Sequence, residues 1–189
     1  MNIILASKSP RRRELLGRLG ISFTVQTADI DETMDETKTP QEEVERVCRK
    51  KAEYIAAKNP DALVIAADTV VVCGGEILGK PKDAADARRM LTLLSDATHE
   101  VMTGYCVSKN GHTQSAVSIS KITFRKLTAA EIEAYIASGE PMDKAGSYGI
   151  QGLASLFVSH VSGDFYAVMG LPICPLCEML RARGVSVFA

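Results

Sequence analysis

The sequence lacks an excess of charge of either sign and lacks any long apolar run, and each absence excludes a class of protein. Its formal net charge is −1, whereas a nucleic-acid-binding domain usually carries a strong positive excess. No stretch approaches the roughly 18 apolar residues that a membrane helix needs. Three arginines, Arg11–Arg13, follow Met1 too soon for the apolar segment of a signal peptide. We therefore expect a cytoplasmic protein that binds neither nucleic acid nor a membrane.

The sequence also lacks the patterns of a disulfide framework or a zinc site. Its five cysteines are an odd number without a secretion signal, which favours free thiols. Cys174 and Cys177 form a CxxC pair, but two further zinc ligands at matching spacing are lacking, and a redox pair would be expected after the first strand. We interpret both as packing cysteines. The three histidines are scattered and form neither a metal pair nor a Ser–His dyad. We expect the aromatic residues Tyr105, Phe124 and Tyr135 in the core rather than at a ligand.

Strand and helix patterns alternate along the 189 residues, which predicts an α/β or α+β fold with a mixed sheet. Strands are expected at residues 2–6, 21–27, 63–72, 76–78, 101–108, 114–126 and 155–162, and helices at residues 10–19, 40–58, 84–94, 129–138 and 172–183. Ser9 is expected to cap the first helix, and Thr128 with Glu131 to form a capping box. The helix at residues 40–58 is expected to face inward with Val44, Val47, Cys48, Ala52 and Ile55. We expect one domain over residues 1–189, although the length also suits two small lobes around a cleft.

The start of the first helix carries cations where the helix macrodipole disfavours them. Arg11, Arg12 and Arg13 all fall in the first turn, where each exposed cation costs about 0.3–1 kcal/mol. The helix N–H groups, Ser7 and Ser9 upstream, and these guanidinium groups together make an anion site. The same pattern suits a solvated basic turn, so by itself it leaves phosphate binding open.

Asp68 interrupts an otherwise apolar strand, where an unpaired carboxylate is costly to bury. It is therefore either paired structurally, or it faces a cleft in which it binds a metal or acts as a base. Asp29, Asp31 and Glu32 lie in an acidic loop that could converge on it. Carboxylates facing a phosphate site would suit Mg²⁺, a hard cation held by oxygen ligands, whereas loop acids alone are usually just solvated.

Two glycine-containing segments add further candidates. Residues Gly74–Lys80 match the pattern G-x-x-x-x-G-K of a P-loop, but Pro81 stands where a P-loop has serine or threonine. We therefore interpret the glycines of this segment as a hairpin turn. Lys80 stays a candidate to project a charge into a cleft. The glycine-rich loop 146–152 permits close backbone approach to a ligand, and its Gln151 offers a donor and an acceptor for a base edge. The loop equally suits a plain bend.

Several motifs occur in the order found in one known family. They are LASKSPRRRELL near the start, DIDET at Asp29–Thr33, KA at Lys51-Ala52, AADTVV at Ala66–Val71, GKP at Gly79–Pro81, DKAGSYGIQG at Asp143–Gly152 and VMGLP at Val168–Pro172. The sequence resembles the Maf proteins, nucleoside triphosphate pyrophosphatases first described as septum-formation inhibitors, over almost the whole chain. The resemblance implies a Maf- and ITPase-like α/β fold, with an elongated, twisted mixed sheet flanked by helices and two lobes around a central cleft.

The resemblance also implies an activity and a set of site residues. The activity is hydrolysis of a nucleoside triphosphate to the monophosphate and pyrophosphate, with a divalent cation, Mg²⁺ or Mn²⁺, and the family suggests a homodimer. The implied roles are triphosphate binding by Ser7, Arg11 and Arg12, cleft lysines at Lys51 for substrate and Lys80 for catalysis, a proton acceptor at Asp68, and a catalytic acid at Glu32 that with Asp68 holds the metal.

Selection of the nucleobase in the family is linked to the positions that Arg11, Thr69 and Gln151 occupy here. The residues at these positions resemble those of the dTTP/UTP group rather than those of the 7-methyl-GTP group. The expected substrate is therefore dTTP, UTP or a modified pyrimidine nucleotide. The alternative is a nucleotide-binding regulator of cell division with little turnover, for which Asp68 and Glu32 would be unnecessary. One minor departure is Asp96, where a glycine is more usual, and we expect it on a surface turn.

Overall fold

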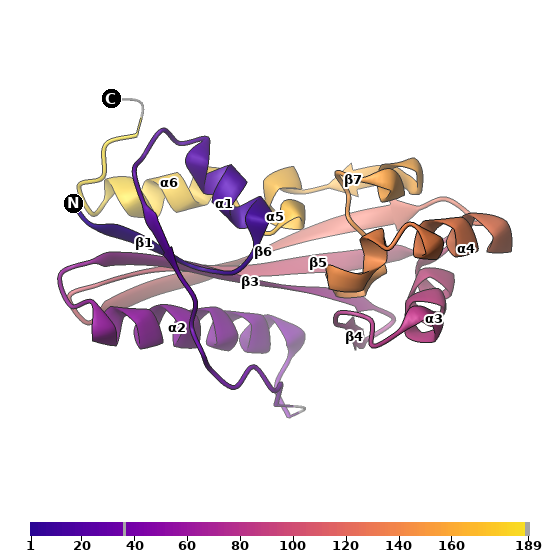
Figure 1. The fold of residues 1–189 in the computed structure, drawn as a ribbon, viewed down its shortest axis with the longest axis horizontal. Helices are drawn as coiled ribbons and strands as arrows, with labels where there is room; N and C mark the ends of the chain where they lie inside the picture. Colours follow the sequence, from indigo (N-terminus) through magenta and orange to yellow (C-terminus); the bar gives the residue numbers. More distant parts are fainter. Residues whose placement is uncertain (36, 188–189) are drawn as a thin grey trace. The chain divides into compact units, whose positions relative to one another are not determined.

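The computed structural model describes residues 1–35 and 37–187, and their fold is of the mixed α/β class predicted from the sequence (Figure 1). The strands are β1 (Ile3–Ala6), β2 (Thr24–Gln26), β3 (Leu63–Cys73), β4 (Glu76–Leu78), β5 (Thr98–Lys109), β6 (His112–Phe124) and β7 (Val158–Ser162). The helices are α1 (Pro10–Gly17), α2 (Pro40–Lys58), α3 (Ala84–Leu94), α4 (Ala129–Ala137), α5 (Phe165–Met169) and α6 (Ile173–Arg181), with short 3₁₀ helices η1 (Glu140–Asp143), η2 (Ala145–Ser147) and η3 (Leu153–Leu156).

The strands of the described residues form one seven-stranded mixed sheet. Its order is β2-β1-β3-β5-β6-β7, with β4 paired to β3. β1 is parallel to both β2 and β3, whereas β4 is antiparallel to β3 and β7 is antiparallel to β6. The helices flank this sheet, as expected for the predicted class.

Contacts within the chain group the described residues into two compact units, each of which is considered by itself. The first comprises Met1–Asp68, Thr103–Ser118 and the described part of Gly170–Ala189, and the second comprises Thr69–Met102 and Ile119–Met169. The single domain and the cleft between lobes stay predictions. In the part of the chain that the structure describes, no helix combines the length and the apolar character that a membrane span requires.

In the first unit, α2 lies on one face of the sheet, and α1 and α6 lie on the other (Figure 1). The sequence accounts for the start of α2, since Thr39 and Glu42 form a capping box and Pro40 follows the cap. Five α2 positions predicted to face inward are all buried: Val44, Val47, Cys48, Ala52 and Ile55. The predicted helix and its inward face are therefore confirmed.

α2 lies unusually close to β5 at Gly104. A Cβ atom at this position would lie 2.5 Å from the carbonyl oxygen of Val44 in α2, closer than packed atoms approach. Glycine therefore permits backbone to approach backbone at this point. Because α2 also carries Lys51, this approach helps to set the distance of Lys51 from the sheet.

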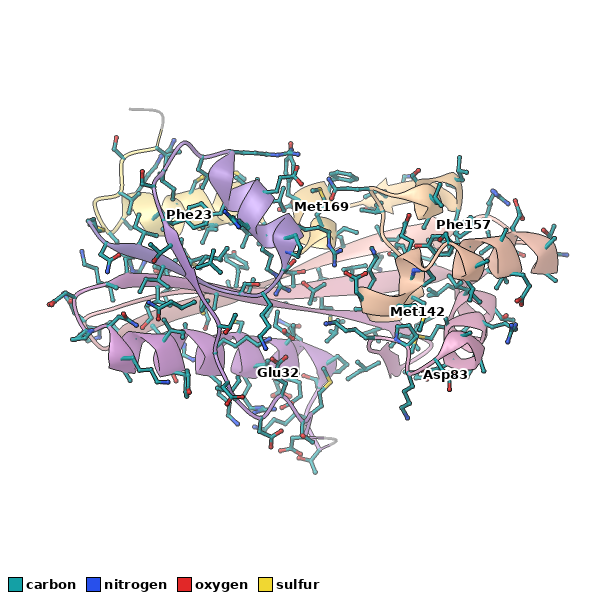
Figure 2. All side chains as sticks on the ribbon, in the orientation of Figure 1. Phe23, Glu32, Asp83, Met142, Phe157 and Met169 are labelled. Atoms are coloured by element: carbon teal, nitrogen blue, oxygen red, sulfur yellow. The ribbon has the colours of Figure 1, made fainter. Side chains whose placement is uncertain are left out.

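The second unit has an aromatic core. Phe124 makes edge-to-face contacts with His99, Tyr148 and Phe157, and Phe157 makes one with Tyr135. Phe157, which is labelled in Figure 2, and the other four are buried. This confirms the prediction that Phe124 and Tyr135 belong to the core.

Local hydrogen bonds account for two differences from the predicted elements. The strand expected at residues 155–162 begins only at Val158, because a 3₁₀ turn precedes it, in which the Ser155 N–H donates to the Gly152 carbonyl at 3.0 Å. The short helix α5 was not predicted. The Asp164 carboxylate accepts the Tyr166 N–H at 2.8 Å at its start, a cap without an apolar pattern long enough to signal a helix.

The cysteines are free thiols, as predicted, but not all of them pack in the core. Cys177 is buried on α6 together with Leu176 and Leu180. Cys174 is exposed, because it lies in the first turn of α6 outside the buried face, so its interpretation as a packing residue is wrong.

Asp96 has a backbone conformation that favours glycine. Its φ is +58°, and it is exposed in the turn between α3 and β5, where the sequence places it. We expect Asp96→Gly to raise the free energy of unfolding by about 0.5–1 kcal/mol, since glycine adopts positive φ without steric strain. Urea unfolding measures the change. The control is Asp61→Gly, because Asp61 is an exposed aspartate that does not have a positive φ. This substitution should lower the free energy of unfolding. An equal change in both variants would contradict this explanation.

Candidate active site

In the first unit, the opening run of serines and arginines surrounds the start of α1. Ser9 caps the helix, and its Oγ accepts the Arg12 N–H at 3.4 Å. Ser7 is buried, and its Oγ accepts the Ser9 N–H at 3.1 Å. The predicted cap, with Pro10 at the first helical position, is confirmed. The positive end of the helix dipole and the basic side chains of Arg11 and Arg12 thus occur in the same turn, which suits an anion.

Arg12 is held by contacts distant in sequence. Its Nε donates to the Gly170 carbonyl at 2.8 Å, and its Nη1 lies 3.5 Å from Ser7 Oγ. Burial lowers the pKa of the guanidinium, while the negative charges of Asp68 and Glu32 act in the opposite direction. Arg12 therefore lies within electrostatic range of both acids. Its hydrogen bond to Gly170 places that residue of the VMGLP motif next to the start of α1.

Lys51 joins two of the predicted acids. Its Nζ donates to Asp68 Oδ1 at 2.7 Å and to Glu32 Oε2 at 2.8 Å. The side chains of Lys51 and Asp68 are 11% and 15% exposed, whereas that of Glu32 is 53% exposed. The Lys51–Asp68 attraction is therefore screened less than that of a surface pair. Figure 2 shows Glu32 on the loop that runs past α2, the helix that carries Lys51.

The pairing with Lys51 explains how a carboxylate is accommodated within β3. It corresponds to the first of the two alternatives for Asp68, a structural pair, while leaving the carboxylate 15% exposed. Of the acids in the loop, Glu32 reaches the Lys51 ammonium, whereas the exposed Asp31 accepts the Thr33 N–H at 2.9 Å in a local turn. Glu32 therefore shares the Lys51 ammonium with Asp68, whereas the convergence of Asp29 and Asp31 on Asp68 stays a prediction.

The two carboxylates bridged by Lys51 are the oxygen donors that a hard cation prefers. Within residues 1–35 and 37–187, no group of three or more His, Cys, Asp or Glu side chains is placed to hold a metal ion. Mg²⁺ is commonly held by one or two carboxylates, with substrate phosphates and waters as its other ligands. Glu32 and Asp68 fit this donor set, in which the substrate supplies the remaining oxygens.

The second unit brings two further motifs together. The Gly79 carbonyl accepts the Gly146 N–H at 3.0 Å, which ties the GKP segment to the glycine-rich loop. Gly146 has a φ of +67°, and a Cβ atom there would lie 2.9 Å from the side chain of Val71 in β3. Only glycine satisfies both constraints, so Gly146 allows the loop to pack directly on the strand.

The predicted site residues Thr69, Lys80 and Gln151 all belong to this second unit. Lys80 and Gln151 are exposed, and Thr69 is half-buried directly after Asp68 in β3. Their roles stay predictions. The glycines before Lys80 form the turn between β3 and β4, with φ of +58° at Gly74 and +84° at Gly75, which confirms the hairpin and the exclusion of a P-loop.

Tyr135 and Glu140 contact the glycine-rich loop and the residue that follows it, a role that no sequence pattern indicated. The Tyr135 hydroxyl accepts the Gly149 N–H at 3.2 Å and donates to Glu140 Oε1 at 3.0 Å. Tyr135 was predicted only as a core residue, and Glu140 carried no recognisable signal because it is a single acid after a helix. The only hint was the position of Glu140 just before the DKAGSYGIQG motif.

Comparison with known proteins identifies close relatives. A family model described as Maf-like protein matches residues 2–183. A dTTP/UTP pyrophosphatase of Moorella thermoacetica is 48% identical over 98% of this chain and 97% of its own. Proteins of the same name from Geotalea uraniireducens and Anaeromyxobacter dehalogenans are 49% and 48% identical, over 97% and 96% of this chain and 95% and 94% of theirs. The structure of protein VC0702 from Vibrio cholerae aligns over 98% of each chain at 11% identity with a TM-score of 0.47, a likeness too weak to carry an inference.

Proposed function

Because the chain belongs to the family of Maf-like proteins, we propose that it hydrolyses dTTP and UTP to the nucleoside monophosphate and pyrophosphate. The relatives that carry this activity in their names cover nearly the whole chain, so the proposal concerns the protein as a whole. The observation that carries the proposal is that Arg12 lies within electrostatic range of Asp68 and Glu32, the two acids bridged by Lys51, within one unit. This arrangement places a candidate anion-binding site, the start of α1, near a candidate base, Asp68.

The triphosphate binds at the start of α1 in this proposal. Ser7 and the helix N–H groups donate hydrogen bonds, and Arg11 and Arg12 neutralise negative charge. Lys51 and Lys80 supply further positive charge, which offsets the charge that develops on the departing pyrophosphate. Part of the Arg12 guanidinium is already held by Gly170, so little conformational freedom is lost when substrate arrives.

Asp68 orients a water molecule and accepts its proton while the water oxygen attacks the α-phosphorus. The bond from the α-phosphorus to the oxygen bridging the α- and β-phosphates breaks, and that oxygen leaves with pyrophosphate. Mg²⁺ or Mn²⁺, when held by Glu32 and Asp68, would neutralise phosphate charge and activate water. Lys51 keeps the two carboxylates close together, and Thr69 and Gln151 contact the pyrimidine base.

The direct test is a pyrophosphate-release assay with standard and modified nucleoside triphosphates in the presence of Mg²⁺ or Mn²⁺. We expect release from dTTP and UTP in excess of release from purine nucleotides, and loss of release on chelation with EDTA. Absence of release from dTTP, UTP and every modified pyrimidine nucleotide would contradict the proposed activity. Saturable nucleotide binding without release would instead support the regulator of cell division.

A further inference from the structure

The Gly149–Leu153 turn, which includes the second half of the glycine-rich loop, is attached at both ends to one pair of side chains. At one end, the Gly149 N–H donates to the Tyr135 hydroxyl at 3.2 Å. At the other end, the Leu153 N–H donates to Glu140 Oε2 at 3.0 Å. The two side chains are themselves joined, since the Tyr135 hydroxyl donates to Glu140 Oε1 at 3.0 Å. Gln151 lies midway between the two attached residues in the sequence.

The loop backbone also rests directly on the Glu140 carboxylate. A Cβ atom at Gly152 would overlap the carboxylate atoms of Glu140, so the loop approaches this closely only with glycine. The Gly152 N–H donates to the Gly149 carbonyl at 3.0 Å, which closes the turn around Gln151. The loop therefore has few alternative positions while Glu140 is in place.

The two side chains are in turn held in position. Tyr135 is buried on α4 and packs edge-to-face on Phe157 at a centroid distance of 5.2 Å. Burial raises the pKa of the Tyr135 hydroxyl, which keeps it protonated and able to donate to Glu140. The Glu140 backbone is anchored separately, since its carbonyl accepts a hydrogen bond from Lys144 Nζ at 2.6 Å.

We propose that Tyr135 and Glu140 are positioning residues for base selection, which hold the Gly149–Leu153 turn so that Gln151 presents its amide at one orientation. Gln151 is exposed, so its own side chain has little packing to orient it, and the orientation comes from the backbone of the turn. The inference rests on the proposed function, because it assigns a source to the selectivity of that same site. Neither residue touches the substrate.

The principal test is Tyr135→Phe, which removes one hydroxyl and keeps the buried ring. We expect the ratio of kcat/KM for dTTP to kcat/KM for GTP to fall about tenfold, the scale of one lost hydrogen bond. Most of the change should lie in the KM for dTTP, with kcat at saturating dTTP within about twofold of wild type, because Tyr135 is not one of the proposed reacting groups. Glu140→Gln should lower the same ratio, since Tyr135 and Leu153 donate to different oxygens of Glu140 and glutamine replaces one of these oxygens by an NH₂ donor.

A matched control is Glu131→Gln, at the start of the same helix. Glu131 also accepts a backbone N–H, that of Thr128 at 2.8 Å, but its partners are the helix cap and Arg125 rather than the loop. This variant loses a comparable stabilising interaction, so it should lower the melting temperature while leaving the dTTP-to-GTP ratio unchanged. Amide hydrogen exchange provides an independent measure: exchange in residues 149–153 should accelerate in Tyr135→Phe and not in Glu131→Gln.

The outcomes separate the inference from the proposed function. If the wild-type protein releases no pyrophosphate, the proposed function fails, and the role in base selection fails with it. If the wild type is selective and folded Tyr135→Phe keeps the full ratio, the inference alone fails. An equal loss of selectivity in Glu131→Gln would also overturn it, because the effect would then follow from general stability. Should Glu140→Gln fail to fold, Tyr135→Phe decides.

Discussion

Replacing Asp68 by asparagine is expected to lower kcat for dTTP by about 10²–10⁴-fold, the usual contribution of a general base. The substitution keeps the size and shape of the side chain but removes its ability to accept a proton from water. It also weakens the 2.7 Å contact with Lys51, since the negative charge is lost. Steady-state pyrophosphate release with dTTP, together with thermal unfolding to verify folding, measures the effect.

The division of the effect between kcat and KM distinguishes two roles of Asp68. A base acts on the chemical step, so its loss lowers kcat and kcat/KM alike. If Asp68 only held Lys51 in place for substrate binding, its replacement would mainly raise KM. Asp61→Asn is the control for the change in net charge, since Asp61 is exposed in the turn before β3, and it should retain full activity. Full activity of a folded Asp68→Asn variant would overturn the assignment.

Acid should destabilise the protein through His99. This ring is 1% exposed, its Nε2 lies 2.8 Å from the Tyr148 hydroxyl, and burial lowers its pKa to about 4. In the unfolded chain its pKa is about 6.5. Between these two values the unfolded state binds a proton that the folded state does not, so stability is present above pH ~6.5 and is lost as the pH falls toward ~4. The expected loss is on the order of 3 kcal/mol.

Denaturant unfolding of the wild type and of His99→Gln, at several pH values between about 4 and 7, tests this expectation. Glutamine can bond to the Tyr148 hydroxyl but does not titrate, so the variant should show a shallower dependence on pH in this window. His160→Gln is the control, because His160 is exposed and its replacement should leave the slope unchanged. If wild type and His99→Gln have the same slope, burial of a neutral His99 is not the source of acid sensitivity.

The loop that contains Tyr148 is therefore connected to the protein core by two sets of contacts. His99 holds Tyr148 from the aromatic core, and Tyr135 with Glu140 holds the turn that follows. We expect the acid effect on stability and the Tyr135 effect on selectivity to be separable. The first depends on the titration of His99, and the second depends on the hydrogen bonds that the Gly149 and Leu153 N–H groups donate to Tyr135 and Glu140.

The sequence by itself determined the elements whose signals are local. Caps and apolar periodicity are properties of neighbouring residues, so Pro40–Lys58 and Ala84–Leu94 were predicted with the bounds that the structure has. The hairpin at Gly74 and Gly75 followed from the backbone freedom of glycine in the same way. Ordered motifs identified the family, and with it the candidate residues.

Only the tertiary structure decided which of those residues meet. Lys51 bridges acids that lie 17 and 19 residues away in the sequence, and Arg12 donates to a carbonyl 158 residues away. No local pattern encodes such contacts, because they depend on how helices pack on the sheet. The same holds for Tyr135, which was predicted only as a core residue. Its hydroxyl acquired a second role because the fold brings the Gly149 backbone to it.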